Sequence, residues 1–328
     1  MCHHLNYGTT LPFSKVIVWG HKMNGHTHMW IHAAFFRTFA FLGYDVAWLD
    51  DNSDLTNIDL SNSLFITEGQ ADEKIPLRDD CRYVLHNCYS LKYDDLRVQG
   101  NVVHLQVYTH KCKNGPVLKT DEYTYIDPES KTIYMPWATD LVPYEIDNMK
   151  KIIRYTPKKK ECHWVGTLYD GDRFSNYDKL KPFMLALEEH GISFFSERYM
   201  SRQENIRLIQ KSAVAPAIVG AWQEQEGYIP CRIFKNISYG AMGVTNSKTV
   251  YELFNKKIIY NPDTERLCHE ALAYIAQMDT KELYELMDFV RDNHTYLNRI
   301  DHLLHFINLI KPLNNYQPTR NEYQIGSQ

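Results

Sequence analysis

The stretch KVIVWG-HKMNGHTH-MWIHAAFFRTFAFLG-YDVAWLDD, residues 15–51, decides the fold class. It opens with a β-branched and aromatic run ending in Gly20, which is typical of a buried parallel strand. Residues 29–43 predict a helix that stops at Gly43, and residues 44–51 predict a second strand. Further strand candidates follow at 63–69, 82–87 and 101–108. Strands that alternate with helices indicate a doubly wound α/β unit.

A second alternation of the same kind begins at residue 161, after a charged, proline-containing segment at 145–160. This segment is the best linker candidate, and a solvated loop inside one domain is the alternative. The later strand candidates are 161–166, 192–197, 213–220, 243–246 and 257–262. Helices are expected at 178–191, 201–212, 231–241 and from 247. The sequence thus predicts two Rossmann-like domains, 1–155 and 156–302, followed by a C-terminal helix and tail at 303–328.

Two such domains leave one main cleft between them, and open α/β sheets bind ligands beyond the carboxyl ends of their strands. The chemistry is therefore expected on four loops, at 20–28, 67–70, 166–173 and 220–236.

The composition excludes several classes of protein. The 328 residues include 36 Lys and Arg against 40 Asp and Glu, a net charge of −4, which argues against a broad nucleic-acid-binding surface. No apolar run is long enough for a transmembrane segment, and the first residues show no signal peptide. Seven scattered cysteines without CxxC spacing indicate reduced thiols. These features predict a cytoplasmic location.

The most informative motif is YIPCRIFKNISYGAMG at 228–243. Pro230 can open a helix, and Arg232 and Lys235, three residues apart, share one side of its first turns. A helix N-terminus favours anions, and Arg can grip phosphate oxygens bidentately. The motif therefore predicts a site for a diphosphate that needs no metal. A solvated basic helix face is the alternative.

This motif resembles the donor-binding helix of GT-B glycosyltransferases, closest to the spore-maturation CgeB-like group. The stretch NHTYLNRI at 293–300 resembles that group's late His-Thr-Tyr…Arg signature, and 250–254 and 259–262 lie between the two motifs in the expected order. The resemblance covers 161–308 and is only architectural over 1–155. It departs at Lys235, where the family commonly has an acidic residue that contacts the donor ribose.

The resemblance implies a GT-B architecture, with an acceptor-binding first domain and a nucleotide-sugar-binding second domain. It implies metal-independent, inverting transfer of a sugar from a UDP- or GDP-sugar to a hydroxyl of a glycan or other acceptor, without a cofactor. The C-terminal helix is expected to pack back on the first domain; contact with a membrane or partner is the alternative. No nucleic-acid partner is expected.

Other contacts with the sugar donor are expected from residues before and within the motif at 228–243. In GT-B proteins the loop at Gly166 and Thr167 approaches the donor phosphates, and glycine permits that approach. An ordinary strand-ending glycine is the alternative. Trp222 or Tyr228 can stack on the nucleobase or instead cap the edge of a core. Asn236 and Ser238 are further candidates for nucleotide contacts.

A catalytic base is expected after the first strand, where many inverting GT-B enzymes carry a histidine. A neutral histidine can remove the acceptor proton at neutral pH. His26 is the first candidate and His28 the second; Glu68, which ends another strand, is an alternative base or acceptor contact. The alternative is that these histidines have only a structural role and cap or hydrogen-bond the loop. His26 and His28, joined by His3 and His4, would be the candidates for a metal site, but no spacing of Cys, His and carboxylates supports one.

Other enzyme classes lack their motifs. The first loop has no GxGxxG, which argues against a nicotinamide enzyme even though Asp50 and Asp51 end the second strand. No Walker A motif, GxSxG or HExxH occurs. Two alternatives remain: a two-domain nucleotide-sugar epimerase and a non-catalytic sugar-binding protein.

Overall fold

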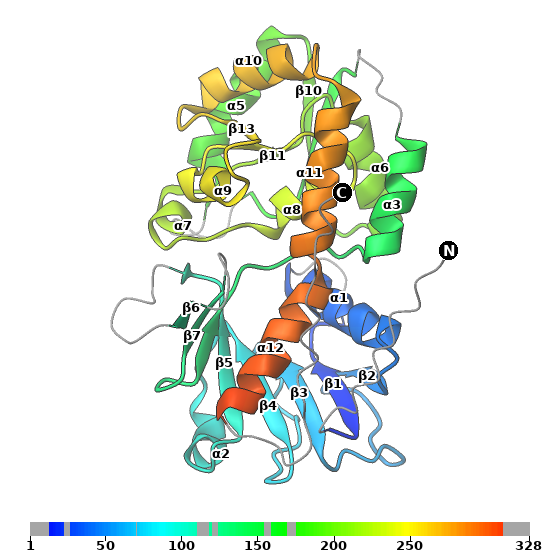
Figure 1. Cartoon of the computed structure of the whole chain (residues 1–328), viewed down its shortest axis with the longest axis vertical. Helices are drawn as coiled ribbons and strands as arrows, with labels where there is room; N and C mark the ends of the chain where they lie inside the picture. The colour runs from blue at the N-terminus through cyan, green and yellow to red at the C-terminus, as the bar shows by residue number, and fades with distance from the viewer. Residues whose placement is uncertain are drawn as a thin grey trace, which may run out of the picture.

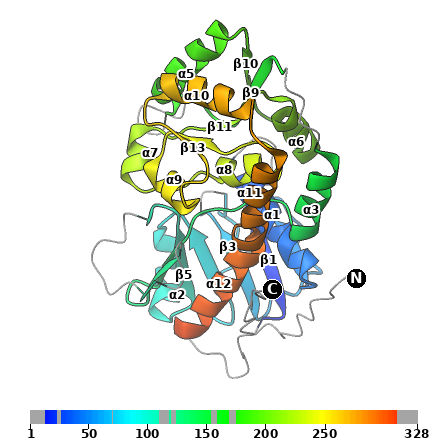
Figure 2. The same ribbon diagram turned by 45° about the horizontal axis from the view of Figure 1, so that its top comes forward.

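The computed structural model forms two lobes, one above the other in Figure 1. It describes residues 13–22, 27–69, 71–109, 118–119, 124–153, 159–168 and 175–310. We call residues 13–142 together with the last helix the first lobe, and residues 143–293 the second lobe. The chain therefore crosses between the lobes twice, and Figure 2 shows the same two lobes from a second direction.

The first lobe is built on one large sheet. Its elements are β1 (Lys15–Trp19), α1 (Thr27–Phe41), β2 (Val46–Leu49), β3 (Ser63–Thr67), β4 (Arg82–His86), η1 (Leu91–Tyr93), α2 (Asp94–Val98), β5 (Val102–Gln106), β6 (Leu118–Lys119), β7 (Tyr125–Asp127), β8 (Thr132–Tyr134) and α12 (Tyr296–Ile310). The strand order is β2-β1-β3-β4-β5-β8-β7-β6. Pairing is parallel from β2 to β8 and antiparallel from β8 to β6.

Both faces of this sheet are covered, as a parallel sheet requires. Successive residues of a strand point to opposite faces. Val16 and Val18 accordingly pack in the core under α1 and α12, whereas Ile17 and Trp19 pack in a second core. Residues 16–19, VIVW, are therefore all apolar and buried, because each face of the strand meets a core.

Helix α12 returns from the second lobe and lies on the first. It contacts α1, where the Phe35 and Tyr296 rings meet edge to face with centroids 4.8 Å apart. Both views show α12 across the sheet of the first lobe (Figures 1 and 2). Its buried face, which includes Leu303 and Phe306, completes the core under α1.

The second lobe has two small parallel sheets, β10-β9 and β11-β12-β13. Its elements are α3 (Pro143–Ile152), β9 (Glu161–Val165), α5 (Tyr177–Glu189), β10 (Ser193–Glu197), α6 (Arg202–Lys211), β11 (Pro216–Ala217), α7 (Ala221–Gln225), α8 (Cys231–Ser238), β12 (Val244–Thr245), α9 (Lys248–Leu253), β13 (Ile259–Tyr260), α10 (Thr264–Ile275) and α11 (Thr280–Asn293). The strand expected over 213–220 is much shorter, and its first residue, Pro216, has no N–H to donate.

The first half of the segment expected as a linker, 145–160, is not a linker, because it belongs to helix α3. Glu145 accepts a hydrogen bond from the Val142 N–H at 3.0 Å, which satisfies a donor at the start of the helix. The Tyr284 hydroxyl on α11 donates to the Lys150 carbonyl at 2.9 Å. Helix α3 thus packs with the second lobe, while residues 154–158 lie outside the described residues.

Candidate functional site

A cleft of about 680 Å³ lies where the two lobes meet. The first lobe lines it with Thr27, His28, Trp30, Glu68, Asn87, Tyr108 and Trp137. The second lobe lines it mainly with residues from the loops after β9, β10 and β11 and from α8. All four loops expected to carry chemistry therefore contribute described residues to one cavity; the loop at 166–173 contributes Gly166 and Thr167.

Helix α8 aims its first turn at this cleft. The residue that precedes it, Pro230, has extended backbone angles and gives no side-chain cap. The Arg232 guanidinium lies over the Trp164 ring, with Cζ 3.6 Å from the centroid, and Nη2 donates to the Val165 carbonyl at 3.2 Å. Burial lowers the pKa of Arg232, and among the described residues its buried Nε has no hydrogen-bond partner. Arg232 is thus held in place by stacking on Trp164, and its guanidinium keeps N–H groups that can still donate to a ligand.

Gly166 is the residue that makes room for this guanidinium. Its φ of +135° lies in the region that L side chains rarely adopt, and a Cβ there would stand 2.6 Å from Arg232 Nη2. The glycine therefore has a specific reason to be there, which is not merely to end the strand. Thr167 follows it on the cleft wall.

Lys235 reaches across the cleft to the first lobe. Its Nζ lies 4.2 Å from the centre of the Trp30 ring on α1, within the range of a cation–π contact. Only 8% of Lys235 is exposed, and no carboxylate of the described chain lies within 4.0 Å of its Nζ. The cleft thus holds two cations, at Arg232 and Lys235, one turn apart.

Asn236 and Ser238 make structural hydrogen bonds. Asn236 Nδ2 donates to the Ala215 carbonyl at 2.9 Å, and 2% of the residue is exposed. The Ser238 hydroxyl bonds the Thr139 hydroxyl at 2.7 Å and is fully buried. Ser238 does not line the cleft, so the geometry gives it a different use from the nucleotide contact expected from the sequence.

Three aromatic rings, of Tyr108, Trp222 and Tyr228, line the cleft next to one another. The Tyr108 ring of the first lobe lies 5.1 Å from the Trp222 ring and 5.6 Å from the Tyr228 ring. Burial raises the pKa of Tyr228. The Thr109 hydroxyl also donates to the Gly227 carbonyl at 3.0 Å. Trp222 and Tyr228 therefore line the cleft while also joining the lobes.

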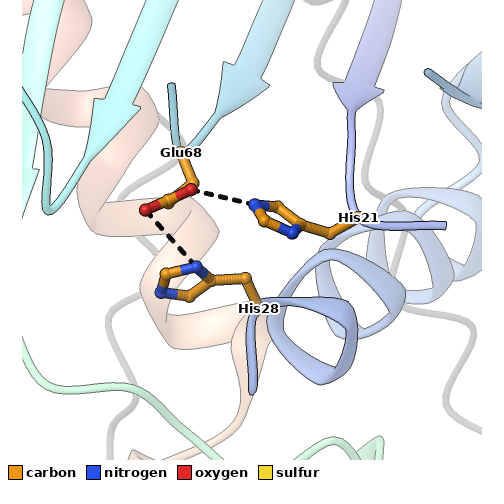
Figure 3. Close-up of side chains that lie close together, drawn as sticks. All are labelled: His21, His28 and Glu68. Atoms are coloured by element: carbon orange, nitrogen blue, oxygen red, sulfur yellow. Dashed lines mark hydrogen bonds and ion pairs between the residues drawn. The ribbon is translucent and has the colours of Figure 1, made fainter. Parts of the chain in front are cut away.

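On the first-lobe side, Glu68 lies between two histidines (Figure 3). His21 Nε2 is 2.9 Å from Glu68 Oε2, and His28 Nδ1 is 3.5 Å from Oε1. His21 follows β1 and Glu68 follows β3, so both stand at the carboxyl edge where the strand order reverses. His26, the first candidate for the base, lies outside the described residues.

The environment keeps Glu68 ionised. Burial raises its pKa, but the hydrogen bonds and charges of His21 and His28 outweigh this effect and lower the pKa to about 2. A buried carboxylate between two imidazoles can orient a histidine and stabilise its protonated form.

Two further histidines, which the sequence reasoning did not assign to the site, lie behind this group. His32 Nδ1 donates to the Gly20 carbonyl at 2.9 Å, and His32 Nε2 lies 2.8 Å from His86 Nε2. Burial lowers the pKa of His32 to about 3 and that of His86 well below its usual value. His32 must therefore accept through Nε2 while His86 donates. The available signals were that His32 falls one helical turn after His28 and that His86 ends a strand.

The late motif at 293–300 is a structural junction. Thr139 and Thr295 form a parallel bridge, so the two chain crossings between the lobes run side by side. Buried Arg299 donates to both crossings, at Pro136 and Trp137 on one and Asn293 and His294 on the other. The His294 ring stacks on Phe234 of α8 at 4.6 Å. The motif thus helps to hold α8, the cation-bearing helix with Arg232 and Lys235, in place through Phe234.

No protein-family model matches the sequence, and no curated protein matches it. Solved structures do. An alpha-glucosyltransferase (AGT) in complex with UDP has a TM-score of 0.56 at 10% identity, over 90% of this chain and 99% of that one. The same kind of enzyme with UDP and a 13-mer DNA containing an HMU base has a TM-score of 0.56 at 9% identity, over 90% and 100%. A third complex contains DNA with a central A:G mismatch, with a TM-score of 0.55 at 10% identity, over 90% and 99%.

This likeness shows the fold. The protein is an α/β protein of GT-B architecture, with two Rossmann-like domains facing a central cleft, as the sequence predicts. Nothing in the comparisons supports the narrower CgeB-like grouping. The expectation that nucleic acid is not a partner also lacks support, because a neighbour of the same fold was solved with DNA. Among the described residues, no helix is both long and apolar enough to cross a membrane.

Proposed function

We propose that the protein is a glycosyltransferase that transfers a sugar from a nucleotide-diphosphate sugar to an acceptor hydroxyl. The observation that carries the proposal is the pairing of two groups across one cleft. Arg232 and Lys235 supply positive charge from α8, and Glu68 with His28 supplies proton chemistry from the opposite lobe. The UDP-bound glucosyltransferases of the same fold support UDP as the first nucleotide to test.

In the proposed reaction the acceptor oxygen attacks the anomeric carbon as the bond to the diphosphate breaks. The electron pair of that bond stays on the departing phosphate oxygen. Arg232, Lys235 and the N-terminus of α8 would offset the charge that develops there without a metal ion. Attack from the opposite lobe would invert the anomeric carbon.

The acceptor proton would pass to a histidine at the end of the first strand. His28 is the candidate that the described contacts support, because Glu68 Oε1 lies 3.5 Å from Nδ1 and can accept a hydrogen bond from Nδ1–H, which leaves the lone pair on Nε2. His26 stays a candidate from its place in the sequence. The donor would be lined by Gly166, Thr167, Trp222 and Tyr228. Asn236 would support the site through its hydrogen bond to the Ala215 carbonyl.

The donor half is tested by titrating UDP and GDP into the full chain by calorimetry. Arg232→Ala should weaken nucleotide binding at least about tenfold, since a charge-assisted hydrogen bond contributes roughly 1.5–3 kcal/mol. Arg207→Ala is the matched control, because Arg207 is exposed on α6 and outside the cleft. Equal affinities of the two variants would contradict the proposed role.

Product analysis tests the reaction. With a nucleotide sugar, the acceptor range should include glycans and, given the DNA-bound neighbours, hydroxyl-bearing bases in DNA. His28→Ala and Glu68→Gln should retain nucleotide binding and lose transfer; unimpaired transfer by both would leave His26→Ala to identify the base. An epimerised nucleotide sugar as sole product would identify an epimerase. Sugar binding without any nucleotide binding would indicate a binding protein.

A further inference from the structure

The group formed by His21, His28 and Glu68 has the composition of a metal site. One ligand atom from each residue can be chosen so that all three lie within 4.8 Å of one another. The residues come from three places in the chain: the end of β1, the first turn of α1 and the end of β3. Their spacing in the sequence, 21, 28 and 68, matches no metal motif, so the fold alone brings them together.

The distances between these atoms suit a small cation. Zinc bonds of about 2.0–2.1 Å in a tetrahedral arrangement place neighbouring ligand atoms about 3.4 Å apart. The two oxygens of Glu68 each contact one histidine, Oε2 at 2.9 Å from His21 Nε2 and Oε1 at 3.5 Å from His28 Nδ1, and these distances lie on either side of that value. An ion could therefore enter between the three side chains with small adjustments (Figure 3).

The donor types select the metal. Two imidazoles and one carboxylate are a common protein ligand set for zinc with one position left for water or substrate. Imidazole suits Zn²⁺, Cu²⁺, Ni²⁺ and Fe²⁺, whereas Mg²⁺ and Ca²⁺ prefer oxygen ligands. His28 and Glu68 line the cleft, so an ion would have an entry path and an open side.

The backbone holds His21 in place for this use. Its φ of +55° is uncommon for a residue other than glycine, and it follows Gly20, whose φ is +87°. The His21 ring packs edge-on against His32 at 5.3 Å, and His32 is tied to the Gly20 carbonyl. His32 thus restricts the orientation of the His21 imidazole. Residues next to a metal ligand commonly orient it in this way.

We propose that His21 Nε2, His28 Nδ1 and Glu68 bind one divalent transition-metal ion, with Zn²⁺ as the best match. If the proposed transfer is correct, this ion is an inhibitor and not a cofactor. A neutral imidazole that binds a metal through Nδ1 carries its proton on Nε2, so His28 loses the lone pair a base requires. The site therefore couples transfer to the level of available zinc.

The test measures metal binding alone, without donor or acceptor. The full chain is stripped with a chelator and titrated with Zn²⁺ in the presence of a competing chelator; Co²⁺ then reports coordination by its visible spectrum. One ion per chain is expected. Glu68→Gln, which keeps the shape of the side chain, and His21→Ala should each weaken binding at least about 100-fold. Far-UV circular dichroism and a cooperative thermal transition show that each variant folds.

Two controls locate the ion. His190 and His269 form a second close pair, with Nε2 2.8 Å from Nδ1, on an exposed surface. His269→Ala should keep the tight site, and so should a variant with His3 and His4 both changed to Ala. No Zn²⁺ binding by the wild-type chain would overturn the proposal, as would a tight site lost with His269 or with His3 and His4 while Glu68→Gln retains it. Nucleotide titration stays independent of these outcomes, so failure of the metal site and failure of the proposed function are distinguishable.

Discussion

Arg232 lies over the ring of Trp164, and the two side chains join the cation-bearing helix to the first strand of the second lobe. The contact leaves the guanidinium facing the cleft beside Gly166. An arginine that is positioned before its ligand arrives loses less entropy on binding than one recruited from solvent. The stacking therefore favours a fixed anion site over a mobile surface charge.

Gly166→Ala tests this arrangement without removing a charge. The new Cβ would stand 2.6 Å from Arg232 Nη2, at a φ of +135°. We expect Arg232 to move from its place and the affinity for UDP to fall about tenfold, or about 1.4 kcal/mol. Gly191→Ala is the control, since its φ is also positive, at +68°, but a Cβ there meets nothing within 4 Å. It should lower stability and leave UDP binding unchanged. The same loss of affinity in both variants would refute the explanation.

Ser238→Ala separates a structural from a nucleotide-binding role. Removing its hydroxyl leaves the buried Thr139 hydroxyl without this partner, 2.7 Å away in the native protein. We expect the free energy of unfolding to fall by about 1–3 kcal/mol, with UDP affinity unchanged within about twofold. Urea unfolding and calorimetry measure the two quantities. Reduced UDP affinity at unchanged stability would restore the role expected from the sequence.

The sequence was a good guide where local pattern and tertiary environment agree. The apolar run at residues 16–19 predicted β1 because both faces of that strand meet apolar cores. The sequence was a poor guide where a single tertiary contact determines the local secondary structure. Residues 145–152 looked like linker because they are charged, but Ile146 is buried and the segment is helix α3. Within the loop expected at 220–236, residues Ala221–Gln225 form a short helix, α7, although none of them is buried.

The candidate site divides in the same way. Arg232 and Lys235 could be predicted together because three residues on a helix place side chains on one face. The group at His21, His28 and Glu68 could not, since no local rule states which loops meet at the carboxyl edge of a sheet. That follows from the strand order, in which β1 lies next to β3. Only His26 and His28 were predicted from the sequence among the histidines, yet His21 makes a shorter contact with Glu68 than His28 does.

Glu145 on α3 binds one arginine from each lobe, and its contact with Arg37 joins the two lobes. Its carboxylate lies 2.8 Å from Arg37 Nη2 on α1 and 3.0 Å from Arg202 Nη1 on α6. Glu145→Gln removes the charge from a partly buried network, and we expect urea unfolding to show a loss of about 2–3 kcal/mol. Glu252→Gln, in the exposed pair with Lys248, should change stability by less than about 1 kcal/mol. Equal effects would mean that the network adds nothing to an ordinary surface pair.

The same carboxylate predicts a pH dependence. Burial raises the pKa of Glu145, but hydrogen bonds from Arg202 and the Val142 N–H and the charge of Arg37 outweigh it, so the pKa is lowered. The folded state then keeps the charge at a pH where the unfolded chain binds a proton. This stabilisation is present above the ordinary value of 4.5 and is lost as pH falls through the lower folded pKa. The stability difference between wild type and Glu145→Gln should therefore shrink below pH 4.5; a difference that stays constant would disprove this origin.

Arg299, outside the cleft, should be a position that is sensitive to substitution. It is 1% exposed and donates to three carbonyls, of Pro136, Trp137 and Asn293, and to His294 Nδ1. Lysine keeps the charge but cannot reproduce the planar set of donors, so Arg299→Lys leaves buried acceptors without partners. We expect a loss of about 3 kcal/mol or more in urea unfolding.

The control for this substitution is Arg207→Lys, which makes the same change on the exposed face of α6 and should alter stability by less than about 0.5 kcal/mol. Arg299 also holds the two chain crossings together, and His294 stacks on Phe234 of α8. The folded fraction of Arg299→Lys should consequently bind UDP more weakly than wild type, because the base of the cation-bearing helix is less well fixed. Native stability together with native affinity would show that the late motif has no structural role at this junction.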